Sequence, residues 1–349
     1  MKYDPRDHGA KCDECPLGPG SVGVLRKGDW QPVGPELHHG ATVLAVAESP
    51  GPDEVIHGRP LVGRGGSEWS HALSSCGKQR TDIDLDNVMC CKPPGQSSGA
   101  WRRLERQLDS INKERAVEGE PRIPHPSECC APRLKAMVER YAAVLTLGRV
   151  ATASVTGNGA SIFKSRGGPL RLSDDRRAMP TLHPSFMLRS PGWRSVFHSD
   201  VSKAFRWFND KLLWTEPDTL WRPVPHELEE WLAQPSPVGI SFLSADGHSH
   251  FYEPVVEAEL KDILRRVFTD GRVWVGHNAG SYDRMVIENH LDVTPKPLVD
   301  TLFPARFRAP DLPKGLKTIG SILTDVERWE TTEKGDSIST GSTDDDELL

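Results

Sequence analysis

A short apolar segment that ends in a carboxylate constrains the fold of this chain more than any other feature. The strand predicted over Thr42–Ala47 is almost entirely apolar, and Glu48 follows it directly, ahead of the turn Ser49-Pro50-Gly51. A continuous apolar run of this length is typical of a strand that is buried on both faces of a parallel sheet. Because Pro and Gly make a stiff, tight turn, we expect Glu48 to be held in place at the end of the strand.

Similar apolar runs alternate with helical segments along the first 213 residues. Further strands are expected to end at Asn87–Cys91, to span Ala142–Gly148 and to end in Ala178–Ser185, with helices over 67–75, 101–115, 134–141 and 199–213. This alternation favours an α/β fold in which helices cover both faces of one sheet, a three-layer α/β/α arrangement. Ligands of such sheets bind beyond the carboxyl ends of the strands, so Glu48 and His183 should face one crevice.

The rest of the chain predicts a second, smaller α/β unit. Residues 214–225 hold three prolines and are expected to link a domain at 1–213 to one at 226–330. In the second unit we expect helices over 226–232 and 256–268 and from Tyr282, strands over 238–244 and 273–278, and a hairpin through Asp246-Gly247. Residues 331–349 carry six acids and one lysine and are expected to form a flexible acidic tail.

Charge and composition narrow the classes of partner. The formal net charge is −6, but the last 19 residues supply −5 of it, so the remaining chain is near neutral and a nucleic-acid partner is not excluded. Arginines gather beside apolar or aromatic residues in segments 101–107, 163–172 and 187–194. Such clusters support a DNA partner, and the alternative interpretation, a solvated surface, is the commoner one for this pattern. With no apolar run of about 18 residues and no apolar leader, we expect a cytoplasmic protein that is neither secreted nor bound to a membrane.

The cysteines point to a metal site rather than to disulfides. The seven are Cys12, Cys15, Cys76, Cys90, Cys91, Cys129 and Cys130. Thiols stay reduced in the cytoplasm, and thiolates prefer zinc or iron–sulfur clusters to hard cations. The pair Cys12 and Cys15 needs two further thiolates, which the pairs 90/91 and 129/130 both offer. The spacing does not decide which metal is bound, nor which of these cysteines complete the site.

Five segments, in order along the chain, resemble the family-4 uracil-DNA glycosylases, which carry a [4Fe-4S] cluster. They are Ala47–Glu54, similar to the family's Gly-Glu-small-Pro-Gly motif, Gly58–Gly63, Asp86–Pro94, Cys130–Leu134, and His183–Arg189, similar to its His-Pro-Ser motif. The resemblance covers about residues 8–212 and implies a uracil-DNA-glycosylase-like three-layer sheet. It also implies that the cluster is held by Cys12, Cys15, Cys91 and Cys130.

The resemblance further implies roles around a uracil that is flipped out of DNA. Glu48 is expected to orient the attacking water, and His183 to donate a hydrogen bond to uracil O2 as negative charge develops there. Asn87 is expected to read the uracil edge through its amide. Glu54 is expected to disfavour the thymine methyl, and Gly51 to bring the backbone close to the base.

Two positions depart from the family pattern. Leu61 replaces the family's stacking Phe, which removes a contact worth about 1–3 kcal/mol per base. Ser49 stands where the family has Gly or Ala, and is expected either to help position the water or to narrow the pocket. For DNA contacts, the resemblance implies Ser185, Arg189 and Arg59, with the loop at 186–194 pressing into the duplex.

Residues 226–349 resemble the 3′–5′ proofreading exonuclease domain of family-A DNA polymerases, a ribonuclease H-like fold. The resemblance rests on Gly276–Asp283 and Val299–Leu302, and implies Asp283, Asn278 and Asp300 as site residues with Mg²⁺ or Mn²⁺ as their metal. The family's first acidic motif is not found, and its third would fall after residue 349. We therefore expect an incomplete domain with little or no nuclease activity.

Two functions are consistent with these patterns. The first is a DNA-repair glycosylase that hydrolyses the N-glycosidic bond of uracil in single- or double-stranded DNA and leaves an abasic site. The alternative is a non-catalytic, DNA-binding accessory protein of a replisome. Its partner would be a DNA polymerase, in a phage-like replication module encoded by a bacterium or a phage. Release of uracil from DNA distinguishes the two.

Overall fold

The computed structural model of the chain describes residues 3–19, 25–26, 29–95, 99–172, 176–211, 258–271, 273–280, 282–296, 298–308 and 319. The chain divides into two compact units, one made of Met1–Leu213 with Gly320–Leu349 and the other of Trp214–Ile319. The expected linker, acidic tail, helix over 226–232, strand over 238–244 and hairpin at 246–247 lie outside the described residues. Every helix within the described ranges is too short or too polar to span a lipid bilayer.

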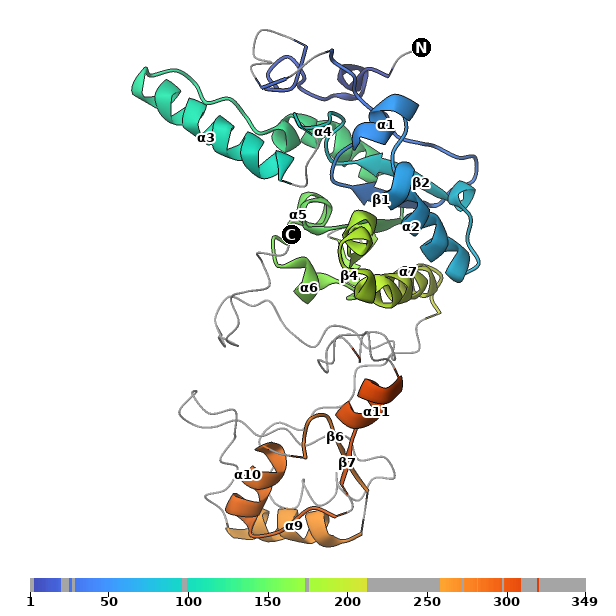
Figure 1. Cartoon of the computed structure of the whole chain (residues 1–349), viewed down its shortest axis with the longest axis vertical. Helices are drawn as coiled ribbons and strands as arrows, with labels where there is room; N and C mark the ends of the chain where they lie inside the picture. The colour runs from blue at the N-terminus through green and yellow to red at the C-terminus, as the bar shows by residue number, and fades with distance from the viewer. Residues whose placement is uncertain are drawn as a thin grey trace. The chain divides into compact units, whose positions relative to one another are not determined.

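One five-stranded sheet forms the centre of the N-terminal unit (Figure 1). Its strands are β1 (Val43–Ala47), β2 (Ile83–Asn87), β3 (Ala143–Leu147), β4 (Leu170–Arg171) and β5 (Arg177–Thr181), in the order β2-β1-β3-β5-β4. The first four strands of that order run parallel, and β4 pairs antiparallel with β5. The register sets Ala47 opposite Asn87 and Leu147 opposite Thr181, so the carboxyl ends of four strands share one edge.

Helices cover both faces of this sheet. They are α2 (Gly63–Ser75), α4 (Pro126–Val138), α5 (Arg149–Thr156) and α7 (Arg194–Phe208). Because successive strand residues point to opposite faces, Ala45 packs into the cluster that contains α2 and α7, whereas Val46 packs into the one that contains α4 and α5. The expected α/β/α layering is confirmed.

Further helices lie in the connections between these elements. They are η1 (Pro5–His8), α1 (Pro52–His57), η2 (Arg80–Asp82), α3 (Ala100–Val117), α6 (Ile162–Ser165), η3 (Pro184–Leu188) and η4 (Pro191–Trp193). Figure 1 shows α3 reaching out from one side of the unit, beside α4. α3 buries Ala100, Leu104 and Leu108 and exposes most of its other residues, as expected for a polar insertion.

Three helices begin earlier than the sequence patterns indicated. α2 begins at residue 63 rather than 67 because its glycines permit close packing, and a Cβ on Gly66 would lie 2.2 Å from the Leu61 carbonyl oxygen. α4 begins at 126 rather than 134, since His125 caps it by accepting a hydrogen bond from the Ser127 amide (3.2 Å). α7 spans 194–208 rather than 199–213, and helices α1 and α5 had not been predicted.

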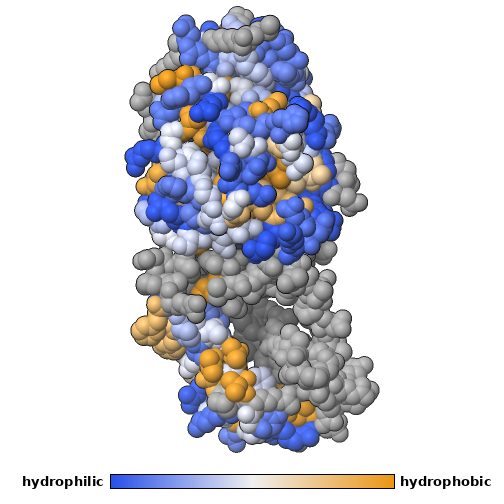
Figure 2. Space-filling model, turned by 90° about the vertical axis from the view of Figure 1, so that its right-hand side faces the viewer, coloured by the Kyte–Doolittle hydropathy of each residue, from blue (hydrophilic) through white to orange (hydrophobic). Residues whose placement is uncertain are grey.

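The described part of the C-terminal unit is a small α/β arrangement. It contains α9 (Ala258–Thr269), β6 (Trp274–Gly276), α10 (Tyr282–Leu291), β7 (Leu298–Asp300) and α11 (Leu302–Arg308), with β6 and β7 parallel. Ile263, Leu264, Val267 and Phe268 of α9 pack with Leu291 as its core. Hydrophobic residues also lie on the surface of this unit (Figure 2), Phe303 and Phe307 of α11 among the exposed ones. The strand and helices expected here are confirmed, whereas the likeness to an exonuclease stays a prediction.

Candidate active site

The residues predicted to act on the substrate come from neighbouring strand ends. Asn87 ends β2, Glu48 follows β1, Gly148 follows β3 and His183 lies two residues after β5. The Gly148 amide donates to the Thr181 carbonyl (2.8 Å), which joins the tips of β3 and β5. A Cβ on Gly148 would lie 3.3 Å from the His183 Cβ, so the turn after β3 contacts the histidine directly.

Glu48 is half-buried and holds a proton more tightly than an ordinary glutamate. Burial and then the Glu105 carboxylate raise the pKa of Glu48 to about 7, against the opposing charge of Arg149. Glu105 belongs to α3 and Arg149 begins α5, so charged residues from two helices act on the pKa of the Glu48 carboxyl. A carboxyl with a pKa near neutrality is suited to take a proton from water.

Asn87 presents a buried amide that lacks partners. The residue is 1% exposed, and neither Oδ1 nor Nδ2 of its side chain has a hydrogen-bond partner within the described part of the chain. A buried polar group left unpaired costs about 1–3 kcal/mol. The Asn87 amide therefore keeps both its donor and its acceptor capacity.

A buried ion pair fixes the backbone of Asn87. An Arg133 nitrogen on α4 lies 2.6 Å from an Asp86 carboxylate oxygen, and both side chains are 1% exposed. Asp86 Oδ1 accepts the Asn87 amide hydrogen (2.8 Å), and Arg133 donates to the Asn87 carbonyl oxygen. Sequence reasoning missed Arg133, although the acids of the buried strand β2 were a usable signal, because buried carboxylates require partners.

The turn after His183 determines which of its ring nitrogens carries the proton. The Ser185 amide donates to His183 Nδ1 (3.2 Å), and the Ser185 hydroxyl lies 2.8 Å from the same nitrogen. A backbone N–H requires a lone pair on Nδ1, so the neutral ring carries its proton on Nε2. Burial and then Arg189 lower the pKa of His183 to about 4, which keeps the ring neutral near pH 7.

Glu54 organises the loop that follows Ser49. Its Oε1 accepts the Leu61 amide hydrogen (2.5 Å) and its Oε2 accepts the Gly51 amide hydrogen. Leu61 is buried with φ +49°, and its carbonyl accepts a hydrogen bond from Arg80 (2.7 Å). Both Glu54 oxygens therefore hold the backbone of the loop in place. The exclusion of a thymine methyl by Glu54 stays a prediction.

The residues expected to contact DNA lie on surface segments near these strand ends. Arg59 and Arg189 are exposed, and Ser185 is half-buried. A Cβ on Gly65 would lie 3.7 Å from Ser185, so the first turn of α2 packs against the His-Pro-Ser segment. Their contacts with DNA stay predictions.

Six of the seven cysteines gather where the N-terminal segment meets α4 and the loop after β2. The Lys11 amide donates to the Cys129 carbonyl (2.9 Å) and joins the first of these segments to α4. Burial, followed by the charges of Cys130, Cys91 and Cys15, raises the pKa of Cys12 to about 12. The three cysteines with which the resemblance groups Cys12 thus all act on its thiol.

The other two members of the gathering form thiol contacts with these four. The Cys129 thiol raises the pKa of Cys15, and the Cys130 thiol raises that of Cys90, so each pair of thiols interacts. No three Cys, His, Asp or Glu side chains among the described residues are arranged to bind a single metal ion. As a donor set, four neighbouring thiols suit a soft metal centre.

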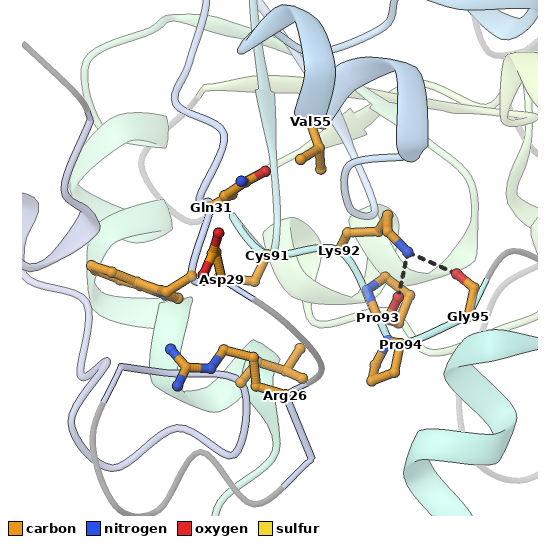
Figure 3. Close-up of a pocket in the computed structure, with 11 residues that line it drawn as sticks. Arg26, Asp29, Gln31, Val55, Cys91, Lys92, Pro93, Pro94 and Gly95 are labelled. Atoms are coloured by element: carbon orange, nitrogen blue, oxygen red, sulfur yellow. Dashed lines mark hydrogen bonds between the residues drawn. The ribbon is translucent and has the colours of Figure 1, made fainter.

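A cavity of about 240 Å³ opens beside Cys91 (Figure 3). Its walls come from the N-terminal segment, α1 and the loop after β2, and include Arg26, Trp30 and Lys92. Lys92 Nζ donates to the Pro93 carbonyl (3.0 Å) and to the carbonyl of residue 95 (2.7 Å). The cavity adjoins the cysteines rather than the strand-end residues, which are not among those that line it.

In the C-terminal unit, Asp300 acts as an anchor for the backbone. Its Oδ1 accepts the amide hydrogens of Asn278 (2.8 Å) and Leu302 (2.9 Å), and its Oδ2 accepts that of Gly280 (3.0 Å). Asp283 is exposed in the first turn of α10. The structure brings Asn278 and Asp300 together around a turn, and a metal-binding role for either residue stays a prediction.

Sequence reasoning also missed residues from the polar insertion. Trp101 donates from Nε1 to the Ser49 hydroxyl (2.8 Å), and Glu105 lies close enough to Glu48 to shift its pKa. Segment 101–107 was noted for its arginines, but no local pattern indicates that Trp101 and Glu105 interact with positions more than fifty residues away.

Comparisons with known proteins agree with this arrangement. The sequence model of the uracil DNA glycosylase superfamily matches residues 35–212. A type-4 uracil-DNA glycosylase of Thermotoga maritima is 30% identical over 201 residues, which cover 56% of this chain and 88% of the relative. One of Pyrobaculum aerophilum is 29% identical over 202 residues, which cover 58% of this chain and 92% of the relative.

These matches and the strand-end site define the class of protein, an α/β DNA glycosylase. The chain belongs to the uracil DNA glycosylase superfamily and, within it, to the type-4 uracil-DNA glycosylases. It is accordingly a hydrolase of DNA repair.

Proposed function

We propose that the enzyme removes a uracil that has been flipped out of DNA and leaves an abasic site. The observation that carries this proposal is the buried, unpaired amide of Asn87. Uracil presents the N3–H donor beside the O4 acceptor, and a side-chain amide offers the complementary pair. Cytosine offers a donor in place of O4, so a fixed amide discriminates against it. A base reaches a site of this kind only after it leaves the helical stack.

In the proposed reaction, water attacks C1′ of the deoxyribose while the C1′–N1 bond breaks. The water oxygen bonds to C1′, the electron pair of the broken bond leaves with uracil as its anion, and the Glu48 carboxylate takes the proton of the water. Ser49 adjoins Glu48 and holds the same water by its hydroxyl. The carboxylate form of Glu48 is the active one.

His183 is proposed to stabilise the departing uracil anion through O2. Its neutral ring presents Nε2–H as a donor, because Nδ1 accepts from the Ser185 amide. A donor that is oriented in advance stabilises charge as it forms, typically by a factor of about 10²–10³ in rate. The loops that carry Arg59 and Arg189 are proposed to hold the DNA backbone around the flipped nucleotide.

We further propose that Cys12, Cys15, Cys91 and Cys130 hold a [4Fe-4S] cluster. Thiolates are the ligands of such clusters, and the other three thiols all act on the pKa of Cys12. Cys12, Cys15 and Cys130 are buried, and Cys91 is half-buried. A bound cluster would cross-link the N-terminal segment, the loop after β2 and α4. Purified protein should then be brown and contain about four irons per chain. Zinc in place of iron would contradict this proposal.

The test of the main proposal is uracil release from oligonucleotides, single- and double-stranded, that carry one uracil. Wild type should release uracil and leave an alkali-labile site. Glu48→Gln and His183→Ala should each slow release by about 10²–10³-fold, and Asn87→Ala should lower kcat/KM by at least about 10-fold. DNA binding, followed by fluorescence anisotropy, should persist in all three variants. A wild type that binds DNA yet releases no uracil would favour the accessory function instead.

A further inference from the structure

The insertion that separates β2 from α4 reaches the reaction centre through one hydrogen bond. Trp101, in the first turn of α3, lies with its indole Nε1 2.8 Å from the Ser49 Oγ. Ser49 directly follows Glu48, whose carboxyl is proposed to take the proton of the water. The insertion is therefore part of the site and not merely a surface addition.

The direction of this hydrogen bond is fixed by chemistry. An indole nitrogen is a donor only, so Ser49 Oγ must be the acceptor. A serine hydroxyl that accepts one hydrogen bond still has its own proton to donate. One lone pair of Ser49 Oγ therefore accepts from Trp101, and the hydroxyl hydrogen of Ser49 must point away from the indole.

The indole is held firmly enough to impose this orientation. Trp101 packs against the buried cluster that contains Leu17 and Leu104, and also against the one that contains Val46 and Met89. The centroid of its ring lies 5.9 Å from the centroid of the His125 ring. A packed aromatic ring has few alternative positions, so little entropy is lost when it holds a partner.

We propose that Trp101 is a positioning residue for the reaction, which orients the Ser49 hydroxyl so that its proton points to the water held by Glu48. A water that accepts from Ser49 and donates to Glu48 keeps its second lone pair for C1′. The inference rests on the proposed roles of Glu48 and Ser49. It adds that a residue of the insertion is required for the orientation of the nucleophile.

A double-mutant cycle under single-turnover conditions tests the proposal. Trp101→Phe removes the N–H and keeps an aromatic ring, and Ser49→Ala removes the acceptor. Each should slow uracil release by about 5- to 10-fold, the scale of one neutral hydrogen bond, with DNA affinity changed less than about twofold. The double variant should be no slower than Ser49→Ala alone. Trp207→Phe, on α7, is the matched control and should leave the rate unchanged.

Equal slowing by Trp101→Phe in the wild-type and Ser49→Ala backgrounds would overturn the inference, as would an unchanged rate in Trp101→Phe. A second readout does not depend on activity: in protein with ¹⁵N-labelled indoles, Ser49→Ala should move the Trp101 resonance, assigned through Trp101→Phe. An unmoved resonance would overturn the inference alone. A wild type that releases no uracil would instead overturn the proposed function, and the catalytic role of Ser49 with it.

Discussion

Two histidines of this chain stand in the sequence His-Pro-Ser and adopt the same local geometry. The serine amide lies 3.2 Å from Nδ1 in both, and the serine hydroxyl lies 2.8 Å from His183 Nδ1 and 2.7 Å from His125 Nδ1. The local sequence therefore sets the tautomer of each ring. Tertiary structure sets their positions, since His183 follows β5 at the active edge while His125 caps α4.

At the residue scale, the first prediction concerns the pH dependence of uracil release. The proposed reaction uses the carboxylate form of Glu48, whose pKa burial raises to about 7. The value of kcat/KM should therefore rise between about pH 5 and pH 8 and level off above the pKa. Glu105→Gln removes a charge that raises this pKa and should move the midpoint down. Arg149→Gln removes a charge that lowers it and should move the midpoint up. Midpoints that stay fixed in both variants would contradict the role of Glu48.

A second residue-scale prediction separates backbone strain from contact with His183. Gly148 has φ +90° and a Cβ there would lie 3.3 Å from the His183 Cβ, whereas Gly157, at the other end of α5, has φ +72° and open space around it. Gly157→Ala, in the left-handed region, should lose about 1–2 kcal/mol of unfolding free energy. Gly148→Ala should lose about 1–3 kcal/mol, because its ψ of 170° places it in a region that is essentially confined to glycine. In single-turnover assays only Gly148→Ala should also slow uracil release, because only its methyl displaces the histidine. Equal rates in the two variants would show that the contact is unimportant.

At the scale of elements, α4 joins the cysteines to β2, the strand that ends in Asn87. Arg133 lies on this helix three residues after Cys130 and is paired with Asp86 in a fully buried setting. Arg133→Met should cost about 3–5 kcal/mol in denaturant unfolding, because it leaves a buried carboxylate without its partner. Lys135→Met, at an exposed position of the same helix, is the matched control and should change stability by less than about 0.5 kcal/mol. A similar loss in both variants would contradict the importance of the pair.

The adjacent cysteines of α4 allow a sharp test of the cluster. Cys130 is among the neighbours that act on Cys12, whereas Cys129 contacts Cys15 through its thiol. Cys130→Ser should lower the iron content and the visible absorbance of the purified protein, and Cys129→Ser should retain both. The pair Cys91→Ser and Cys90→Ser should behave in the same way. Loss of iron in Cys129→Ser with retention in Cys130→Ser would reverse the assignment.

At the scale of the whole molecule, uracil release should reside in the N-terminal unit. The family match ends at residue 212, and the sheet, the strand-end residues and the cysteines all lie within 1–213. A chain that ends after residue 213 should keep the wild-type single-turnover rate within about twofold. A loss of activity in a folded fragment, checked by circular dichroism, would assign part of the site to residues 214–349. Full-length protein with Mg²⁺ or Mn²⁺ is expected to leave uracil-free DNA intact.

The sequence predicted β1 and β3 closely, missed the short strand β4, and placed the helix starts poorly. Strands buried on both faces are apolar throughout, so β1 and β3 were located to within one residue at each end. Helix starts depend on caps and close packing: α2 begins inside a glycine run, and α4 begins at Pro126 under a histidine cap. Glu48, Asn87 and His183 could be placed at one edge because parallel strands end on the same side.

The sequence by itself determined the local features: the strand ends and the residues directly after them, the tautomer of His183, and the supply of thiols. Only the tertiary structure decided which distant groups act on them. Trp101 lies 52 positions from the Ser49 that it contacts, and Arg133 lies 47 from Asp86. Such pairs depend on how α3 and α4 pack against the sheet, and packing is set by the shapes of many side chains at once rather than by any local pattern.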